Sequence, residues 1–174
     1  MNTKSLSSLS LILIALLSLF SCTKTEEIDK LPPITMEGKN TLGFLLDGKV
    51  WVPYQESSGI FTPTLEFNMD GNVLRGGARL KNNNIDQKFS ITIQVIKEEI
   101  IQIDSNYVGV FFINNKNTGF SCNEYRNTTN TSYINISKLD WDDRIIAGTF
   151  EFPMMVSGCQ DTVSITEGRF DLKF

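Results

Sequence analysis

The 174-residue sequence contains no histidine and only three cysteines. Histidine serves both as a general base and as a metal ligand, so its absence excludes a Ser-His-Asp triad, a Cys-His pair and imidazole-bound metal. The few cysteines, far apart in the chain, make no zinc site. No glycine-rich phosphate-binding motif is present. Carboxylates and aromatic side chains are therefore the residue types left for chemistry or recognition.

Basic residues are scarce as well. There are 16 Lys and Arg against 20 Asp and Glu, a formal net charge of −4 at pH 7, and no Lys/Arg cluster. Proteins that bind nucleic acid carry a basic patch or stripe, so the sequence predicts no nucleic-acid partner.

No apolar run is long enough for a transmembrane helix, which needs about 20 residues. The run that ends at Phe20 is shorter and is interrupted by serines, and Lys4 precedes it, so residues 1–21 are typical of a secretory signal peptide. The closing Leu19-Phe20-Ser21-Cys22 resembles a bacterial lipobox, which implies that Cys22 is lipidated and becomes the mature N-terminus. We therefore predict a cell-envelope, outer-membrane lipoprotein held by its acyl chains. An ordinary signal peptide with an incidental cysteine is the alternative.

Residues 22–40 are polar, contain Pro32-Pro33, and have no helical or strand period. We interpret them as a lipidated N-terminus followed by a flexible tether. Glu26-Glu27 lies close to the anchor, which resembles the export signals of Bacteroidetes-type surface lipoproteins and implies surface exposure. The periplasmic face stays open as the alternative. Removal of residues 1–21 takes one lysine and no acid, so the mature charge becomes −5.

Residues 41–174 are expected to form one domain, because a chain of this length is of usual domain size. Short alternating segments run through this range, separated by turn signals, of which Asp47-Gly48 and Asp70-Gly71 are the strongest. The clearest alternation spans residues 88–95. About ten short strands predict an all-β antiparallel domain, a β-sandwich, with a closed or partly open, lipocalin-like barrel as the alternative.

Cys122 and Cys159 remain after lipidation of Cys22 and are candidates for a disulfide, since an exported chain meets conditions in which disulfides persist. A bridge across this long loop would remove about 4 kcal/mol of unfolded-state freedom. Two buried free thiols are the alternative.

Two surface segments are candidates for ligand binding. Residues 114–131 are expected to form a long polar loop, which is uncommon in a compact domain and often functional, and they carry Tyr125 and Arg126. Trp141 lies at the expected tip of a hairpin, where its ring is available to stack on a flat ligand. We predict these three residues as contacts for a glycan or an envelope protein. For Trp141, packing back onto the sheet is the alternative.

The densest acidic cluster is Asp140, Asp142 and Asp143 at the same hairpin tip. Compared with the calcium loop of EF-hands, Asp140 and Asp142 match, whereas Arg144 and Ile145 replace a ligand and the turn glycine. A plain polar turn is the favoured interpretation, and calcium at these three acids is kept as a candidate. No other cofactor is expected.

Several segments resemble a family of small, uncharacterised Bacteroidetes-type lipoproteins. They are LLDGKVWVP at 45–53, INISKLD at 134–140, IIAGTFEF at 145–152 and VSITEGRFD at 163–171. The resemblance implies an envelope-anchored all-β domain and supplies no catalytic residues. Asp161-Thr162-Val163 is also similar to the O-glycosylation acceptor pattern of exported proteins of this type.

A chain with export and anchoring signals, polar loops and no catalytic constellation predicts a non-catalytic binding or accessory lipoprotein. A hydrolase or lyase that uses carboxylates, and a structural envelope protein, are the two alternatives.

Overall fold

The computed structural model describes residues 30–57, 60–62, 64–82, 84–95, 97–102, 108–115, 124–127, 132–156 and 161–174. Cys22, Cys122 and Cys159 lie outside this part, and with them the predicted lipidation and disulfide. Every regular element in the described residues is a β-strand, and no helix there is long and apolar enough to cross a membrane. The strands are β1 (Thr41–Leu46), β2 (Lys49–Trp51), β3 (Tyr54–Ser57), β4 (Ile60–Thr62), β5 (Leu65–Asp70), β6 (Val73–Lys81), β7 (Asp86–Gln94), β8 (Ile100–Gln102), β9 (Val108–Asn114), β10 (Glu124–Asn127), β11 (Tyr133–Asp140), β12 (Ile145–Met155) and β13 (Thr162–Lys173).

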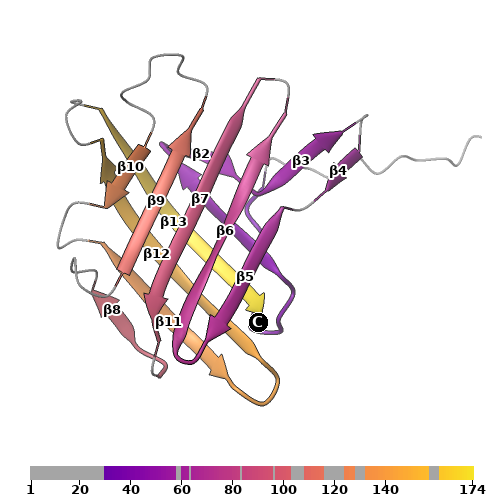
Figure 1. Ribbon diagram of the computed structural model, residues 1–174, viewed down its shortest axis with the longest axis vertical. Helices are drawn as coiled ribbons and strands as arrows, with labels where there is room; N and C mark the ends of the chain where they lie inside the picture. The colour runs from indigo at the N-terminus through magenta and orange to yellow at the C-terminus, as the bar shows by residue number, and fades with distance from the viewer. Residues whose placement is uncertain are drawn as a thin grey trace, which may run out of the picture.

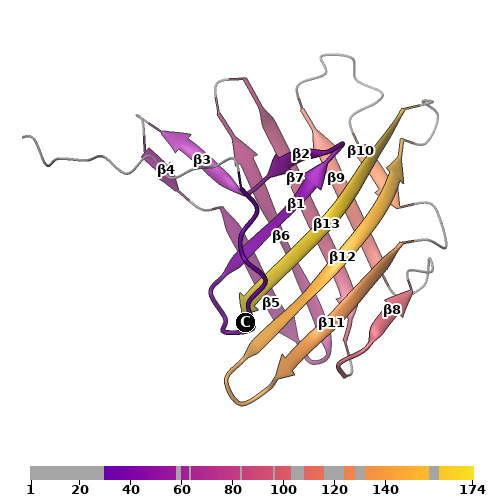
Figure 2. The same cartoon turned by 180° about the vertical axis from the view of Figure 1, so that it is seen from behind.

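All thirteen strands belong to one sheet, ordered β2-β1-β13-β12-β10-β9-β7-β6-β3-β4, with β11 beside β12, β8 beside β11, and β5 beside β6 (Figures 1 and 2). Only the short β3–β6 contact is parallel. The sheet curls into a half-barrel, which confirms the all-β prediction and is compatible with both a sandwich and a partly open barrel. Strands far apart in sequence, such as β1 and β13, lie side by side.

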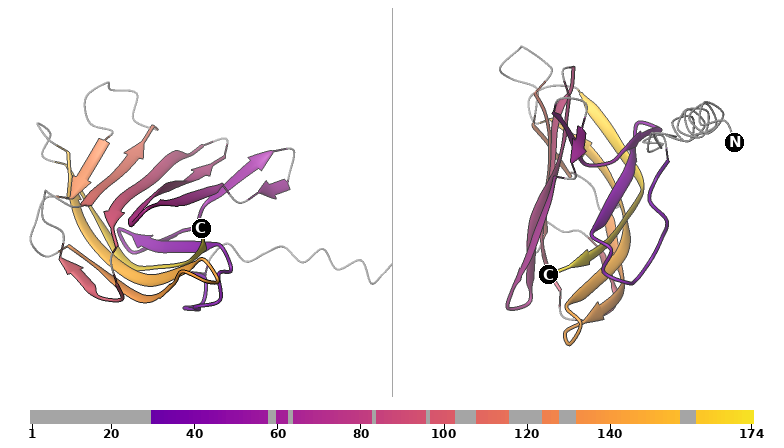
Figure 3. Two further views of the ribbon diagram at one scale, coloured as in Figure 1. Left: turned by 60° about the horizontal axis from the view of Figure 1, so that its bottom comes forward. Right: turned by 90° about the vertical axis from the view of Figure 1, so that its right-hand side faces the viewer.

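The half-barrel has two walls that face each other across the core (Figure 3). We call β5, β6, β7 and β9 the front wall, and β1, β13, β12, β11 and β8 the rear wall. The short strand β10 joins them, because it pairs with β9 on one side and with the end of β12 on the other. On the opposite side β5 pairs with β6 alone, so the two walls are not joined there.

The space between the walls is occupied by stacked aromatic rings. Phe44 stacks on Trp51 with a centroid distance of 4.5 Å, and Phe89 stacks on Phe150 at 5.5 Å. The Trp51 indole nitrogen donates a hydrogen bond to Oε1 of Gln87 at 2.9 Å, so its one polar atom is satisfied inside the core. A cavity in this core is only about 10 Å³, so this part of the interior has no room for a ligand.

Both predicted hairpin turns are present. Asp47 and Gly48 each have positive φ, +49° and +77°, as a two-residue type I′ turn requires. At the second turn the loop residues are Gly71 and Asn72, one position later than predicted, and of the two only Gly71 has positive φ.

Two features differ from the strand pattern that the sequence favours: the additional short strands and the regular pairing at Gly76-Gly77. Strand β10 forms inside residues 114–131, which were expected to be a loop, and the short strands β3, β4 and β8 were not predicted. Glycine inside a strand often marks a bulge, but at Gly76-Gly77 the register with both β5 and β7 is unbroken. A bulge near Gly168, where Glu167 has φ +51°, shifts the register of β13 against β12 and leaves β13 continuous.

Candidate functional site

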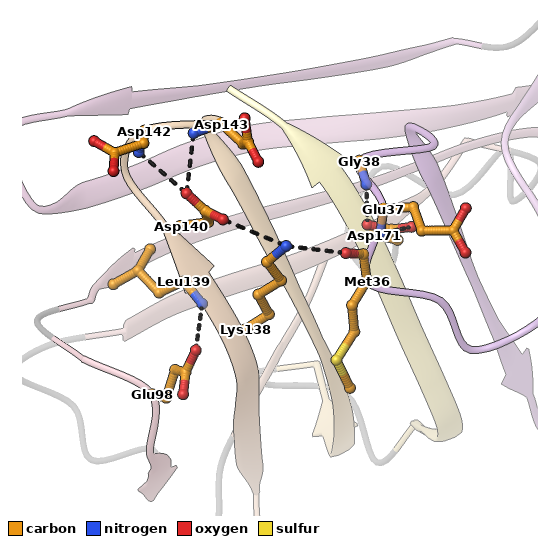
Figure 4. Close-up of polar contacts among 10 residues, drawn as sticks. All are labelled: Met36, Glu37, Gly38, Glu98, Lys138, Leu139, Asp140, Asp142, Asp143 and Asp171. Atoms are coloured by element: carbon orange, nitrogen blue, oxygen red, sulfur yellow. Dashed lines mark hydrogen bonds and ion pairs between the residues drawn. The ribbon is translucent and has the colours of Figure 1, made fainter.

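Residues 30–40, expected to belong to the tether, lie against the outer face of the rear wall, and we call them the N-terminal strap. The strap is held by Asp171, whose side chain is 1% exposed. Its carboxylate accepts hydrogen bonds from the backbone N–H groups of Glu37 and Gly38 at 3.0 and 2.7 Å (Figure 4). It also accepts from the Thr35 hydroxyl at 2.6 Å and from the backbone N–H of Lys39 at 3.3 Å. Burial alone would raise the pKa of Asp171, but these donors hold it below its usual value.

The strap is also fixed at other points. Pro32 packs on Gly43 so closely that an added Cβ there would lie 2.6 Å from the proline ring. The Lys138 ammonium donates to the Met36 carbonyl at 3.4 Å, and the Asn40 side chain accepts from the backbone N–H of Lys173 at 2.8 Å. In the described structure the chain is therefore part of the domain surface from about residue 30.

The predicted acidic cluster forms a turn between β11 and β12. One oxygen of Asp140 accepts from the N–H groups of Asp142 and Asp143 at 3.1 and 2.9 Å, and the other lies 3.4 Å from the Lys138 ammonium (Figure 4). The Asp143 N–H is the main reason that the pKa of Asp140 lies below its usual value. This is the geometry of a polar turn, and the described residues hold no group of three side chains arranged to bind a metal.

Trp141 lies on the same turn and is 49% exposed. One edge of its ring packs against Phe174, with centroids 5.7 Å apart and the planes at 76°. The ring therefore folds partly back onto the end of β13 and keeps about half of its surface for contact with a ligand.

Tyr125 and Arg126 lie on β10 and point to opposite faces. The Tyr125 side chain is 2% exposed, and its hydroxyl donates to Asp161 at 2.6 Å. Burial first, and then the Asp161 carboxylate, raise the pKa of Tyr125 to about 12. Arg126 is exposed, pairs with Glu124 at 2.7 Å, and lies 4.7 Å above the Phe111 ring.

The three predicted ligand residues are thus not brought together. Tyr125 belongs to the core, Arg126 to the outer surface of β10, and Trp141 to a turn at the opposite end of the sheet from β10 (Figure 1). Thr162, in the predicted glycosylation pattern, is exposed as the first residue of β13.

A larger opening lies on the outer face of the front wall, and we call it the outer groove. Its volume is about 630 Å³, within the range of ligand sites. It is lined by Thr64, Leu65, Glu66, Asn68, Arg75, Gly76, Gly77, Ala78, Arg79, Lys88, Phe89, Ser90 and Ile113. Gly77 forms part of the floor, where a Cβ would lie 2.8 Å from the Phe89 carbonyl oxygen.

Ion pairs fix the polar wall of the outer groove. Arg79 donates two hydrogen bonds to Asp86, at 2.8 and 2.7 Å, which lower the pKa of that carboxyl. Arg75 pairs with Asp70 at 3.3 Å at an exposed position. Among the described lining residues, Glu66 is the one carboxylate. The arrangement offers hydrogen-bond donors on a fixed frame, which suits recognition of a polar ligand.

The outer groove was not found from the sequence. Its lining comes from four neighbouring strands, and their register decides which polar side chains meet. The signal available was Gly76-Gly77 between alternating charged residues, which marks a place where the strand surface is hollow.

Comparison of the chain with protein-family models, with curated proteins and with solved structures found no match.

Proposed function

We propose that this protein is an outer-membrane lipoprotein, anchored through Cys22, that works as a non-catalytic binding module and uses the outer groove to hold a glycan or a partner protein. The observation that carries the proposal is the relative placement of the strap and the outer groove. The strap, which leads to the anchor, covers the outer face of the rear wall (Figure 3). The outer groove opens on the outer face of the front wall.

This placement suits a tethered receptor. Lys30 lies eight positions after Cys22, so at about 3.5 Å per residue the anchor lies no more than about 28 Å from the point where the strap begins. A short tether attached to the rear wall favours orientations in which the front wall faces away from the bilayer. The outer groove is then accessible to ligands from solution.

The charge pattern of the outer groove favours binding over hydrolysis. A glycosidase places two carboxylates on either side of the scissile bond, whereas Glu66 is the one acid in the described lining. The neighbouring acids Asp70 and Asp86 are each engaged by an arginine. A hydrolase would need a second carboxylate free to face Glu66.

Anchoring is tested by metabolic labelling with an alkyne fatty acid. The wild-type protein is expected to incorporate the label and to remain with the outer-membrane fraction, and the Cys22→Ala variant to do neither. Labelling that survives in the variant would contradict lipidation at this residue.

Binding is tested by thermal shift against a panel of neutral and acidic glycans, since a ligand that binds only the folded state raises the melting temperature. Ser90→Tyr fills the outer groove from an outward-facing position of β7 and leaves the core unchanged. The variant is expected to lose any shift that the wild type shows, and Thr92→Tyr, one outward position further along β7, is the matched control. If a glycan raises the melting temperature of Ser90→Tyr as much as that of the wild type, the glycan binds outside the outer groove. If no glycan raises the melting temperature of the wild type, glycan binding is contradicted and a partner protein is the remaining ligand to test.

A further inference from the structure

We infer that β5 is a docking site for an extended peptide, which adds to the free edge of the sheet as one further antiparallel strand. This inference goes beyond the proposed function, because the surface lies on the other side of β5 from the outer groove and requires no lipid anchor. The partner is a neutral peptide strand with apolar side chains at every second position.

The edge of β5 differs from the other edges of the described sheet. Strands β2, β4 and β8, each with one partner, have three residues apiece, whereas β5 has six and pairs only with β6. Proteins protect such edges with lysine, proline or a bulge. The sequence of β5, LEFNMD, contains neither lysine nor proline, and its register with β6 is unbroken from Leu65 to Asp70.

The hydrogen-bond phase of β5 identifies which backbone groups face outward. The Arg79 N–H donates to the Thr64 carbonyl at 2.9 Å, so residue 64 bonds toward β6. Because the phase alternates in an antiparallel pair, residues 66, 68 and 70 also bond toward β6. The N–H and C=O groups of Leu65, Phe67 and Met69 therefore point to the free edge, three donors and three acceptors in an extended row.

Space for a strand exists beside this row. A cleft of about 480 Å³, which we call the edge cleft, runs along residues 65–68 of β5. Its opposite side is lined by Lys39, Asn40, Leu172 and Lys173. Its far rim is fixed, because Asn40 at the end of the strap is bonded to Lys173 at the end of β13. The edge cleft is the place where the two walls of the half-barrel are not joined.

The lining of the edge cleft selects the kind of peptide. Leu65 and Phe67, which are only partly buried against the core, supply apolar surface on the core side, which suits apolar side chains at alternate positions. The charges at the rim balance, since Lys39 is paired with Glu37 at 3.0 Å and Lys173 shares the rim with Glu66. Backbone hydrogen bonds and apolar contacts would therefore determine affinity, with little selection by charge.

The test uses full-length protein in detergent and an acetylated, amidated heptapeptide of alternating valine and threonine. Amide exchange at Leu65, Phe67 and Met69 is expected to slow at least tenfold with saturating peptide, and exchange at Glu66 and Asn68 to change less than threefold. Equal changes at both sets, or none at either, would overturn strand addition at β5.

Two N-methylated peptides provide the matched control. In an antiparallel pair the peptide residues that face the core also direct their N–H groups toward β5. Methylation of the valine nitrogens is thus expected to weaken binding at least tenfold, and methylation of the threonine nitrogens less than threefold. Any other pattern would overturn the antiparallel arrangement.

Protein variants separate the backbone from the side chain. Leu65→Pro removes one edge donor at the first residue of a strand, where proline is tolerated, and Leu65→Ala removes the same side chain but keeps the donor. The proline variant is expected to bind the peptide at least fivefold more weakly than the alanine variant. Equal peptide affinity of the two variants would overturn the proposal. Protection of the Leu65, Phe67 and Met69 amides that rises with protein concentration in the absence of peptide would also overturn it, because the occupant would then be a second copy of the chain.

Discussion

Replacement of Asp171 by asparagine should release the N-terminal strap without disturbing the core. The substitution keeps the size of the side chain but removes its charge and turns one acceptor into a donor. The four donors that now bond to the carboxylate are the Thr35 hydroxyl and three backbone N–H groups. A hydrogen bond to a charged group contributes about 1.5–3 kcal/mol. The released strap regains bonds to water, so we expect a net loss of about 3 kcal/mol.

Urea unfolding measures this loss, and amide exchange locates it. For a chain of this size 1 kcal/mol corresponds to about 2–4 °C in melting temperature, so a fall of about 6–12 °C is expected. Exchange at Gly38 and Lys39 should accelerate strongly, and exchange in β7 should follow only the global stability. Asp142→Asn, at an exposed turn position, is the control. A loss below 0.5 kcal/mol with the strap amides still protected would refute the account of the strap.

The pH dependence of stability tests the role of Asp171 independently, because its direction follows from the lowered pKa of this carboxyl. An unperturbed aspartate titrates near pH 3.9, and the pKa of Asp171 in the folded protein is lower. The unfolded chain therefore takes up the proton at a higher pH than the folded chain does. The stabilisation from Asp171 is then complete above about pH 4 and is lost as the pH falls through the folded-state pKa. The difference in stability between wild type and Asp171→Asn should shrink below pH 4.

Three further predictions test packing, titration and redox state. Gly168→Ala would place a methyl group against an aromatic ring of the core, and it should lower the free energy of unfolding in urea by about 1–3 kcal/mol. Gly48→Ala should lower it less, because the space there is open and only the positive φ opposes the change. The Tyr125 phenol should ionise near pH 12 in a titration followed at 295 nm. The stabilisation from its neutral form is therefore complete below about pH 10 and is lost between about pH 10 and pH 12. The Tyr125→Phe variant should lack this ionisation and should lose about 1 kcal/mol of unfolding free energy. Cys122 and Cys159 are predicted to resist alkylation until reduced, and labelling of both without reductant would contradict the disulfide.

The hairpins could be predicted from sequence because their determinants are local. Asp47-Gly48 supplies positive φ at two adjacent residues, and the flanking segments alternate, so turn type and register follow from a few neighbouring positions. The buried position of Trp51 also follows from local alternation with its neighbours.

The strap could not be predicted because its partner lies far away in the chain. Gly38 and Asp171 are separated by 133 positions, and neither shows a pattern that connects them. A polar segment with prolines and no period has the composition of a tether. It becomes ordered here because one buried carboxylate satisfies several of its backbone donors at once. The short strand β10 is a similar case, since Tyr125 is buried in an Asn- and Thr-rich stretch and its hydroxyl bonds to Asp161, 36 positions away.

The strap also connects the two proposed binding surfaces in a way that separates them experimentally. Lys39 and Asn40, at the end of the strap, form the far rim of the edge cleft, whereas the lining of the outer groove includes no strap residue. Release of the strap by Asp171→Asn therefore removes one rim of the edge cleft and leaves the outer groove intact. Peptide affinity at β5 should change in this variant while glycan binding stays the same. A parallel change in both would mean that β5, which contributes to both surfaces, moves with the strap.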